Sequence, residues 1–203
     1  SVMPGGSQTI AETVNAVADG RLSSRQWVEH CLEHVRNNEA LGCWSFVDEA
    51  RALARADQMD GIRKDGSALG SLHGCPIGVK DIIEVSAMPH GCGSPLMGEV
   101  SDQNAVLVDA LEAAGAVILG KTETTEFAFL NPARTKNPHS QEFSPGGSSA
   151  GSAAAVASGD VPVAIGSQTN GSVIRPASYC GVYAMKPSAG IIPRIGVFEQ
   201  SPT

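Results

Sequence analysis

Positive charge and long apolar runs are both scarce in this 203-residue chain. Lysine and arginine total 14 against 21 acidic residues, which gives a net charge of −7, and they form no cluster. A nucleic-acid-binding protein usually carries a basic stripe, so we expect no nucleic-acid partner. No apolar run approaches the roughly 18 residues that cross a membrane, and no basic stretch followed by an apolar run marks a signal peptide. These absences predict a cytoplasmic protein that binds neither nucleic acid nor membrane.

Cysteine and histidine are also few, and neither shows metal-site spacing. The five cysteines are dispersed without a CxxC pair, which favours reduced thiols over a disulfide framework or a zinc site. Of the five histidines, only His30 and His34 are four residues apart, and no acidic residue is spaced with them as in HExxH. We therefore predict no metal and no other cofactor.

Aromatic residues make up only 4% of the chain while 42% is hydrophobic, which suits small-residue packing between helices and a sheet. The N-terminal part predicts helices: one capped by Ser7 and ended by Gly20, one beginning near Ser23 or Ser24, and one over 47–59, before a loop over 60–72. Beyond residue 75, apolar strands alternate with helices, which predicts an α/β fold with a mixed sheet flanked by helices. The strands are expected at 76–85, 116–120, 161–166 and 182–185, and the helices at 104–114, 124–129, 149–158 and 172–181.

Two glycine- and serine-rich segments, 144–152 and 166–172, carry the chemistry. Glycines allow positive φ angles and close backbone approach, so consecutive N–H groups can point at an anion or at the oxyanion of a reacting carbonyl. A Walker-type phosphate loop is excluded because no lysine follows the last glycine. Residues 147–151 match the G-x-S-x-G pattern of a nucleophile elbow. That motif needs an apolar strand before it and a histidine after it, and the last histidine of this sequence is His139, so the elbow interpretation fails. A flexible linker is disfavoured by the flanking apolar, alanine-rich stretches.

The block formed by Gly-Gly-Ser-Ser-Ala-Gly-Ser at 146–152 and Gly-Ser-Val-Ile-Arg-Pro at 171–176 resembles the signature of the amidase-signature family. Further segments resemble that family in the same order: 73–81 its lysine segment, 114–122 its connecting strand and 185–188 the segment after the signature. The resemblance covers roughly residues 69–203. It implies a single amidase-signature domain over 1–203, incomplete at its C-terminus, with an N-terminal helical portion over 1–65 and a catalytic α/β core over 66–203.

The resemblance implies an amidohydrolase that cleaves a small-molecule carboxamide through an acyl-enzyme. By position, Ser172 is the nucleophile, Ser148, preceded by a cis peptide bond, is the bridging serine, and Lys80 is the terminal base. A lysine can serve as base only when burial or nearby positive charge lowers its pKa, and Lys80 follows the apolar run 76–79. The alternative interpretation of Lys80 is a solvated surface lysine that pairs with Asp81.

Two further sets of residues are implied by position. The backbone N–H groups expected to hold the oxyanion are those of Thr169, Asn170, Gly171 and Ser172. The residues expected to bind substrate are Gly147, Ser149 and Arg175. Ser149 and Ser152 fit helix caps equally well, and Arg175 also fits a structural arginine that satisfies loop carbonyls.

One loop departs from the family's common pattern, Asp-Thr-Gly-Gly-Ser with an arginine two residues later. Here Gln-Thr-Asn-Gly-Ser at 168–172 is followed by Arg175 three residues on. This variant is similar to malonamidase-like enzymes, which act on small amides bearing a carboxylate, and the forked guanidinium of Arg175 suits a carboxylate. It disfavours a glutamine-hydrolysing amidotransferase subunit, which stays an alternative beside a non-catalytic or truncated subunit. The expected partners are a small-molecule amide and either a second copy in a homodimer or a completing C-terminal chain.

Overall fold

A four-stranded mixed sheet forms the centre of the computed structural model, which describes residues 9–200. β2 and β3 pair in parallel, and every residue of both is buried. β4 joins β2 in parallel and β1 joins β3 antiparallel, so the sheet is mixed and the predicted fold class is confirmed. The strands lie in the order β1 (Trp44–Val47), β3 (Val117–Thr122), β2 (Pro76–Lys80) and β4 (Val163–Ile165).

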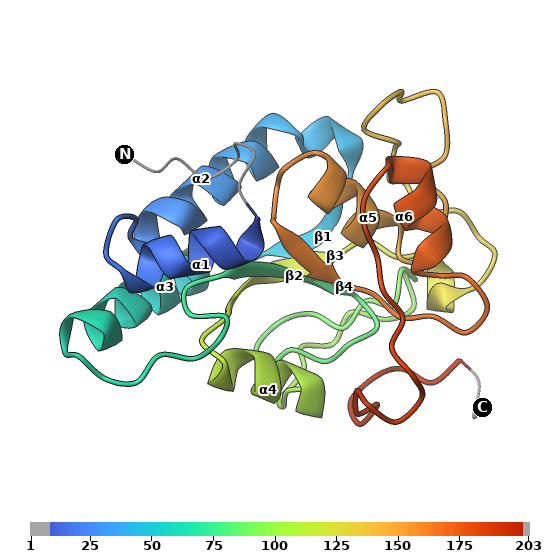
Figure 1. Ribbon diagram of the computed structural model, residues 1–203. Helices are drawn as coiled ribbons and strands as arrows, with labels where there is room; N and C mark the ends of the chain where they lie inside the picture. The colour runs from blue at the N-terminus through green and yellow to red at the C-terminus, as the bar shows by residue number, and fades with distance from the viewer. Residues whose placement is uncertain (1–8, 201–203) are drawn as a thin grey trace.

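Helices cover both faces of this sheet (Figure 1). In that view α1, α2 and α5 lie above the sheet and α4 lies below it. Across residues 9–200, no helix is both long and apolar enough to span a bilayer. The helices are α1 (Ile10–Ala18), α2 (Ser24–Asn37), α3 (Glu49–Lys64), α4 (Val106–Ala113), α5 (Ala150–Ala157) and α6 (Ile174–Cys180), with short 3-10 turns at Glu39–Leu41 and Glu126–Ala128.

The first two helices begin at hydroxyl caps. Before α2, the Ser23 hydroxyl accepts the N–H of Gln26 at 2.9 Å, and the Gln26 side chain accepts the N–H of Ser23 at 3.0 Å. Before α1, the same reciprocal arrangement joins Thr9 and Glu12. Ser7, the predicted cap of α1, lies outside the described residues, and Thr9 makes the cap.

The prediction that the N-terminal part is helical missed β1. Residues 44–47 pair with β3, and the third helix begins at Glu49 and ends at Lys64 rather than spanning 47–59. A four-residue strand at the edge of a sheet shows no readable alternation of its own. Tertiary contacts define it instead: the indole N–H of Trp44 donates to Asp160 at 2.9 Å.

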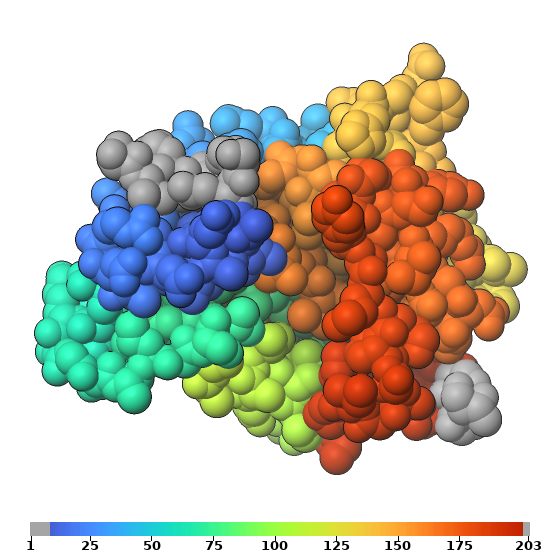
Figure 2. Space-filling view, viewed as in Figure 1, coloured from blue at the N-terminus to red at the C-terminus, as the bar shows by residue number. Residues whose placement is uncertain are grey.

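The strand predicted at 182–185 is wrong. This stretch is irregular, with Tyr183 and Met185 exposed, and it finds no ladder partner within residues 9–200. Figure 2 shows the segment after α6 running down one side of the molecule towards α4. Further along it reaches the segment that follows β2, where the N–H of Phe198 donates to the carbonyl of Ile82 at 2.7 Å.

Candidate active site

Helix α5 reaches the sheet because residue 151 is glycine. A Cβ at Gly151 would lie 2.3 Å from the carbonyl oxygen of Cys43 and 2.4 Å from the backbone nitrogen of Glu123, closer than any Cβ can approach. The glycine N–H donates instead to the Glu123 carbonyl at 2.9 Å. This contact packs the first turn of α5 against the ends of β1 and β3, and it brings the segment that precedes α5 next to the end of β2.

Lys80 is the last residue of β2, and its side chain is 0% exposed. Its ammonium donates to the hydroxyl oxygens of Ser148 at 2.6 Å and Ser167 at 2.9 Å. Among the described residues, no carboxylate lies within 4.0 Å of it. Burial lowers the pKa of Lys80 to about 7. The alternative of a solvated lysine paired with Asp81 is therefore wrong, because the Asp81 carboxylate pairs with Lys121 at 2.7 Å.

Ser148 is buried at the turn that leads into α5, and its hydroxyl meets Lys80. The peptide bond between Gly147 and Ser148 is cis, as the family resemblance implies. The Ser148 carbonyl accepts the N–H of Thr125 at 3.2 Å and the hydroxyl of Thr124 at 3.2 Å. These contacts tie the turn to the segment that follows β3.

Ser172 lies in the loop between β4 and α6, half-buried, and lines a cleft of about 460 Å³ together with Ser148 and Ser167. Its carbonyl accepts the N–H of Ser149 at 3.1 Å. Its hydroxyl has no hydrogen-bond partner among residues 9–200. The structure thus brings Lys80 and Ser148 into contact and sets Ser172 in the wall of the same cleft. Catalytic hydrogen bonds are often long in ligand-free enzymes and tighten in the substrate complex.

The loop before Ser172 leaves its backbone donors available. Within the described part of the chain, the four N–H groups of residues 169–172 donate to no acceptor, neither backbone nor side chain. The next two N–H groups, those of Val173 and Ile174, both donate to the Oε1 atom of Gln168 at 3.0 Å. Four consecutive unpaired donors beside a cleft suit an anion or a developing oxyanion.

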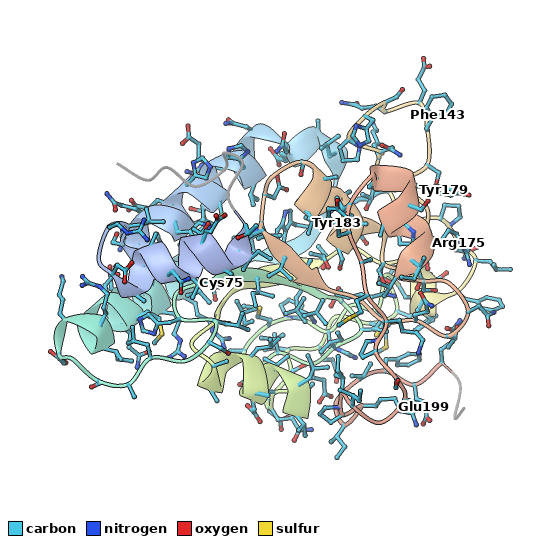
Figure 3. The ribbon with its side chains drawn as sticks, viewed as in Figure 1. Cys75, Phe143, Arg175, Tyr179, Tyr183 and Glu199 are labelled. Atoms are coloured by element: carbon cyan, nitrogen blue, oxygen red, sulfur yellow. The ribbon has the colours of Figure 1, made fainter. Side chains whose placement is uncertain are left out.

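The three residues predicted to bind substrate differ in position. Ser149 is buried, and its hydroxyl accepts the N–H of Ser167 at 3.2 Å and donates to the carbonyl of the same residue at 3.2 Å. Gly147 packs on Thr125, whose methyl carbon would lie 2.9 Å from an added Cβ. Arg175 is exposed on α6 and is not among the residues that line the cleft (Figure 3).

The alternative roles of two serines as helix caps are wrong. Ser149 occupies the position before α5, yet its hydroxyl makes no capping hydrogen bond. Ser152 lies inside α5, where its hydroxyl contacts that of Thr122 at 2.6 Å and donates to the carbonyl of Ile165 at 2.9 Å. Both side chains fasten α5 to its neighbours instead of closing its end.

Sequence reasoning missed several residues of the cleft. Ser167 and Gln168 stand inside the glycine- and serine-rich segment 166–172, so their place in that motif was a usable signal. Arg194 and Glu199 reach the cleft from the segment after α6, which lies below α6 in Figure 3. No local pattern marks them, because their position depends on how that irregular segment folds back. Among the described residues, no three His, Cys, Asp or Glu side chains gather as a metal site would require.

A family model described as Amidase matches residues 26–203 of the chain. The chain belongs to the amidase-signature family. Its relatives include a glutamyl-tRNA(Gln) amidotransferase subunit from Clostridium botulinum (strain Eklund 17B / Type B), 37% identical over 95% of this chain and 41% of the relative. The corresponding protein from Methanosarcina mazei (strain ATCC BAA-159 / DSM 3647 / Goe1 / Go1 / JCM 11833 / OCM 88) is 42% identical over 86% of this chain and 37% of the relative.

Solved structures of the amidase-signature fold superpose closely on this chain. Native peptide amidase from Stenotrophomonas maltophilia does so with a TM-score of 0.91 at 33% identity, covering 97% of this chain and 43% of that one. A second match is a chain from a structure described as a vestigial protein complex that reveals the evolutionary origins of an s-triazine catabolic enzyme. Its TM-score is 0.90 at 36% identity, and the match covers 95% of this chain and 44% of that chain. The chain spans less than half the length of the curated relatives and solved structures it matches.

Proposed function

We propose that the protein hydrolyses the amide bond of a small carboxamide through an acyl-enzyme. The Ser172 hydroxyl oxygen attacks the carboxamide carbon while its proton passes through the Ser148 hydroxyl to the neutral amine of Lys80. The proton then returns to the leaving nitrogen, the C–N bond breaks, and ammonia or an amine departs from an ester on Ser172. Water, deprotonated along the same route, cleaves that ester and releases the carboxylic acid.

The state of Lys80 is the observation that carries this proposal. An amine whose pKa is lowered to about 7 is half neutral at neutral pH, whereas an ordinary lysine is almost wholly protonated there. The ammonium has hydroxyl oxygens as partners, one of them 2.6 Å away on Ser148, and no carboxylate within 4.0 Å among the described residues. A group so perturbed beside a cleft that holds a second serine is suited to proton transfer. The unpaired N–H groups of residues 169–172 supply the matching oxyanion donors.

Covalent labelling tests the proposal directly. A fluorophosphonate probe reacts with an activated serine, and intact-mass spectrometry of the full protein counts the adducts. We expect one adduct on wild type, none on Ser172→Ala, and much slower labelling of Lys80→Met. Ammonia release from a panel of small primary amides should fall in the same order. A folded wild-type protein that takes up no probe, or an adduct that survives in Ser172→Ala, would refute the assignment of Ser172.

A glutamine-hydrolysing amidotransferase subunit is the second candidate, and the relatives favour it. The departures in loop 168–172 weigh against it, but relatives that carry the name of that enzyme are 36–42% identical to the chain. Both candidates share the acylation chemistry and differ in the amide and in the fate of ammonia. Ammonia released from L-glutamine faster than from simple aliphatic amides would favour the amidotransferase. The reverse order would favour a free-standing amidase.

Substrate and partners are further parts of this proposal. A carboxylate-bearing amide was predicted from Arg175, whereas the arginine that lines the cleft is Arg194. Arg175→Ala and Arg194→Ala are compared on a neutral amide and on the monoamide of a dicarboxylic acid. The arginine that contacts the carboxylate is the one whose loss slows only the second substrate, and equal rates in both variants would refute a carboxylate contact by either arginine. We also propose that a C-terminal portion or partner chain, absent from residues 1–203, completes the cleft. A cytoplasmic location is supported by the five cysteines, all of which are free.

A further inference from the structure

The side chain of Gln168 spans the loop that carries the proposed nucleophile. Its Oε1 atom accepts the N–H of Val173 at 3.0 Å and the N–H of Ile174 at 3.0 Å. The four residues 169–172 therefore form a loop closed at its start by the chain itself and at its end by two hydrogen bonds. Gln168 is half-buried and lines the same cleft as Ser172.

These hydrogen bonds hold one of the two peptide units that flank Ser172. The carbonyl of that unit, which belongs to Ser172, accepts the N–H of Ser149 at 3.1 Å. Its N–H, which belongs to Val173, donates to Gln168 at 3.0 Å. Both polar groups of the peptide are thus fixed, one by the segment of the bridging serine and one by the start of the loop itself. Held in this way, the peptide resists the rotations that would move the Ser172 side chain out of line.

We propose that Gln168 is a positioning residue for acyl transfer, which holds loop 169–172 so that the Ser172 hydroxyl and the loop N–H groups act on one carbonyl. The inference rests on the proposed role of Ser172 as nucleophile. Its physical basis is that misplacement of a reacting group by about 1 Å can cost roughly 10²-fold in rate. A single acceptor atom, Oε1 of Gln168, meets both N–H groups at once.

The competing explanation is that Gln168 only caps the seven-residue helix α6. A cap contributes to the stability of the helix and leaves the chemistry of the folded molecule unchanged. Positioning predicts something different: a lower rate of acylation in protein that is still folded, with little change in KM. The isosteric Gln168→Glu keeps both the size of the side chain and an acceptor oxygen. It therefore shows whether an effect comes from the lost hydrogen bonds or from any change of side chain at this position.

The experiment compares Gln168→Leu, Gln168→Glu and a control, Gln58→Leu, in the full protein. Gln58 is an exposed glutamine on α3 whose side chain accepts from Arg55. The maximal rate of fluorophosphonate labelling and the melting temperature are measured for each. We expect Gln168→Leu to label roughly 10²-fold more slowly, with KM for a small amide changed far less than kcat. Gln168→Glu should label within about tenfold of wild type, and Gln58→Leu at the wild-type rate.

Two results would overturn the inference. One is wild-type labelling by Gln168→Leu, and the other is equal slowing in the Leu and Glu variants together with an equal drop in melting temperature. If Gln168→Leu does not fold, hydrogen exchange in wild type decides: the amides of Val173 and Ile174 should exchange at least about tenfold more slowly than those of residues 169–171. Equal exchange would overturn the inference. A wild-type protein that does not label refutes the proposed function itself, and the inference falls with it.

Discussion

Two lysines are fully buried on neighbouring strands of the sheet, and their surroundings are opposite. Lys121 on β3 donates to the Asp81 carboxylate at 2.7 Å and to the carbonyl of Pro89 at 2.9 Å. The Asp81 carboxylate in turn accepts the hydroxyl of Ser45 at 3.0 Å. Within residues 9–200, Lys80 on β2 donates only to the hydroxyl oxygens of two serines. The Lys121 ammonium thus has a buried counter-charge, and the Lys80 ammonium has none in the part of the chain that the structure describes.

The alternation of side chains along a strand explains this difference. In the parallel register Lys121 lies beside Val79, so these two side chains share one face of the sheet, and Lys80 points to the other face. Asp81, one residue after Lys80, returns to the face of Lys121 and pairs there. The alternation therefore separates Lys80 from the acid next to it in sequence, and no carboxylate within residues 9–200 offsets the desolvation of its ammonium. We infer that a buried lysine is suited to act as a base when the alternation of the strand directs the neighbouring carboxylate to the other face of the sheet.

Removing Lys80 should have the largest effect on activity. Lys80→Met keeps the apolar stem and removes the base, so we expect kcat to fall by about 10⁴-fold or more while the protein still folds. Steady-state ammonia release with the preferred amide measures the loss. Activity within tenfold of wild type would show that Lys80 is not the base, so that its lack of a counter-charge would have no catalytic meaning.

The same variant tests the cost of burying Lys80. Because the pKa is about 7 in the folded protein and near 10.5 in the unfolded chain, the unfolded state binds more protons between these values. Wild-type stability should therefore rise with pH from about 7 towards 10.5 through this group, and below pH 7 the full penalty applies. Lys80→Met lacks this contribution. Its advantage in free energy of unfolding over wild type should shrink as the pH is raised through that window.

Removing Lys121 should have the second-largest effect, on stability. Lys121→Met leaves the Asp81 carboxylate buried without its partner, which typically costs about 3–5 kcal/mol. Urea unfolding measures the loss. Replacing both partners, as in Lys121→Met with Asp81→Leu, should recover much of it, because no unpaired charge remains. Equal stability of Lys121→Met and wild type would show that the ion pair between Lys121 and Asp81 does not stabilise the fold.

The pH dependence of acylation should follow Lys80. The neutral amine is the active form, so the rate of fluorophosphonate labelling should rise with pH, reach half its plateau near pH 7, and fall about tenfold per pH unit below that. The residual rate of Lys80→Met should lack this step. A wild-type midpoint above pH 9 would mean that burial does not lower the pKa of Lys80.

The resemblance to the family allowed the proposed reacting residues to be predicted by position, whereas contacts between segments far apart in the sequence could not be predicted. Ser148 and Ser172 stand in glycine-rich segments whose backbone needs are visible in the sequence, and the two buried strands β2 and β3 are apolar enough to be identified. The edge strand β1 was missed because its four residues gain their strand character from pairing with β3. The irregular segment that brings Arg194 to the cleft has no periodicity, so its path was not predictable.

The Lys80–Asp81 pair shows why local sequence patterns have limits. The two residues are adjacent, and a surface ion pair was a reasonable alternative for them. All of β2 is buried, which the sequence next to it does not reveal, and this burial excludes solvent from Lys80. Asp81 lies on the other face and pairs there with Lys121. Ser167 was missed for a related reason: a serine two residues beyond β4 gains its role only because β4 pairs with β2, the strand of Lys80.

Ser167→Ala should give the smallest effect, and it tests whether the hydroxyl partners of Lys80 contribute to its pKa. The Ser167 hydroxyl accepts from the Lys80 ammonium at 2.9 Å and so stabilises the charged form. Its removal should lower the pKa further and move the midpoint of the labelling profile to lower pH by roughly one unit or less. The plateau rate should fall by about tenfold at most, because Ser148 still holds the amine.

The matched control is Ser45→Ala, which removes the hydroxyl that donates to Asp81 beside Lys121. It should leave the midpoint where it is, because Lys121 takes no part in the proton route. A midpoint that rises or stays fixed in Ser167→Ala, or one that moves equally in both variants, would mean that the hydroxyl partners of Lys80 do not set its proton affinity. Desolvation alone would then account for the difference between the two lysines, and Ser167 would be only a neighbour of the site.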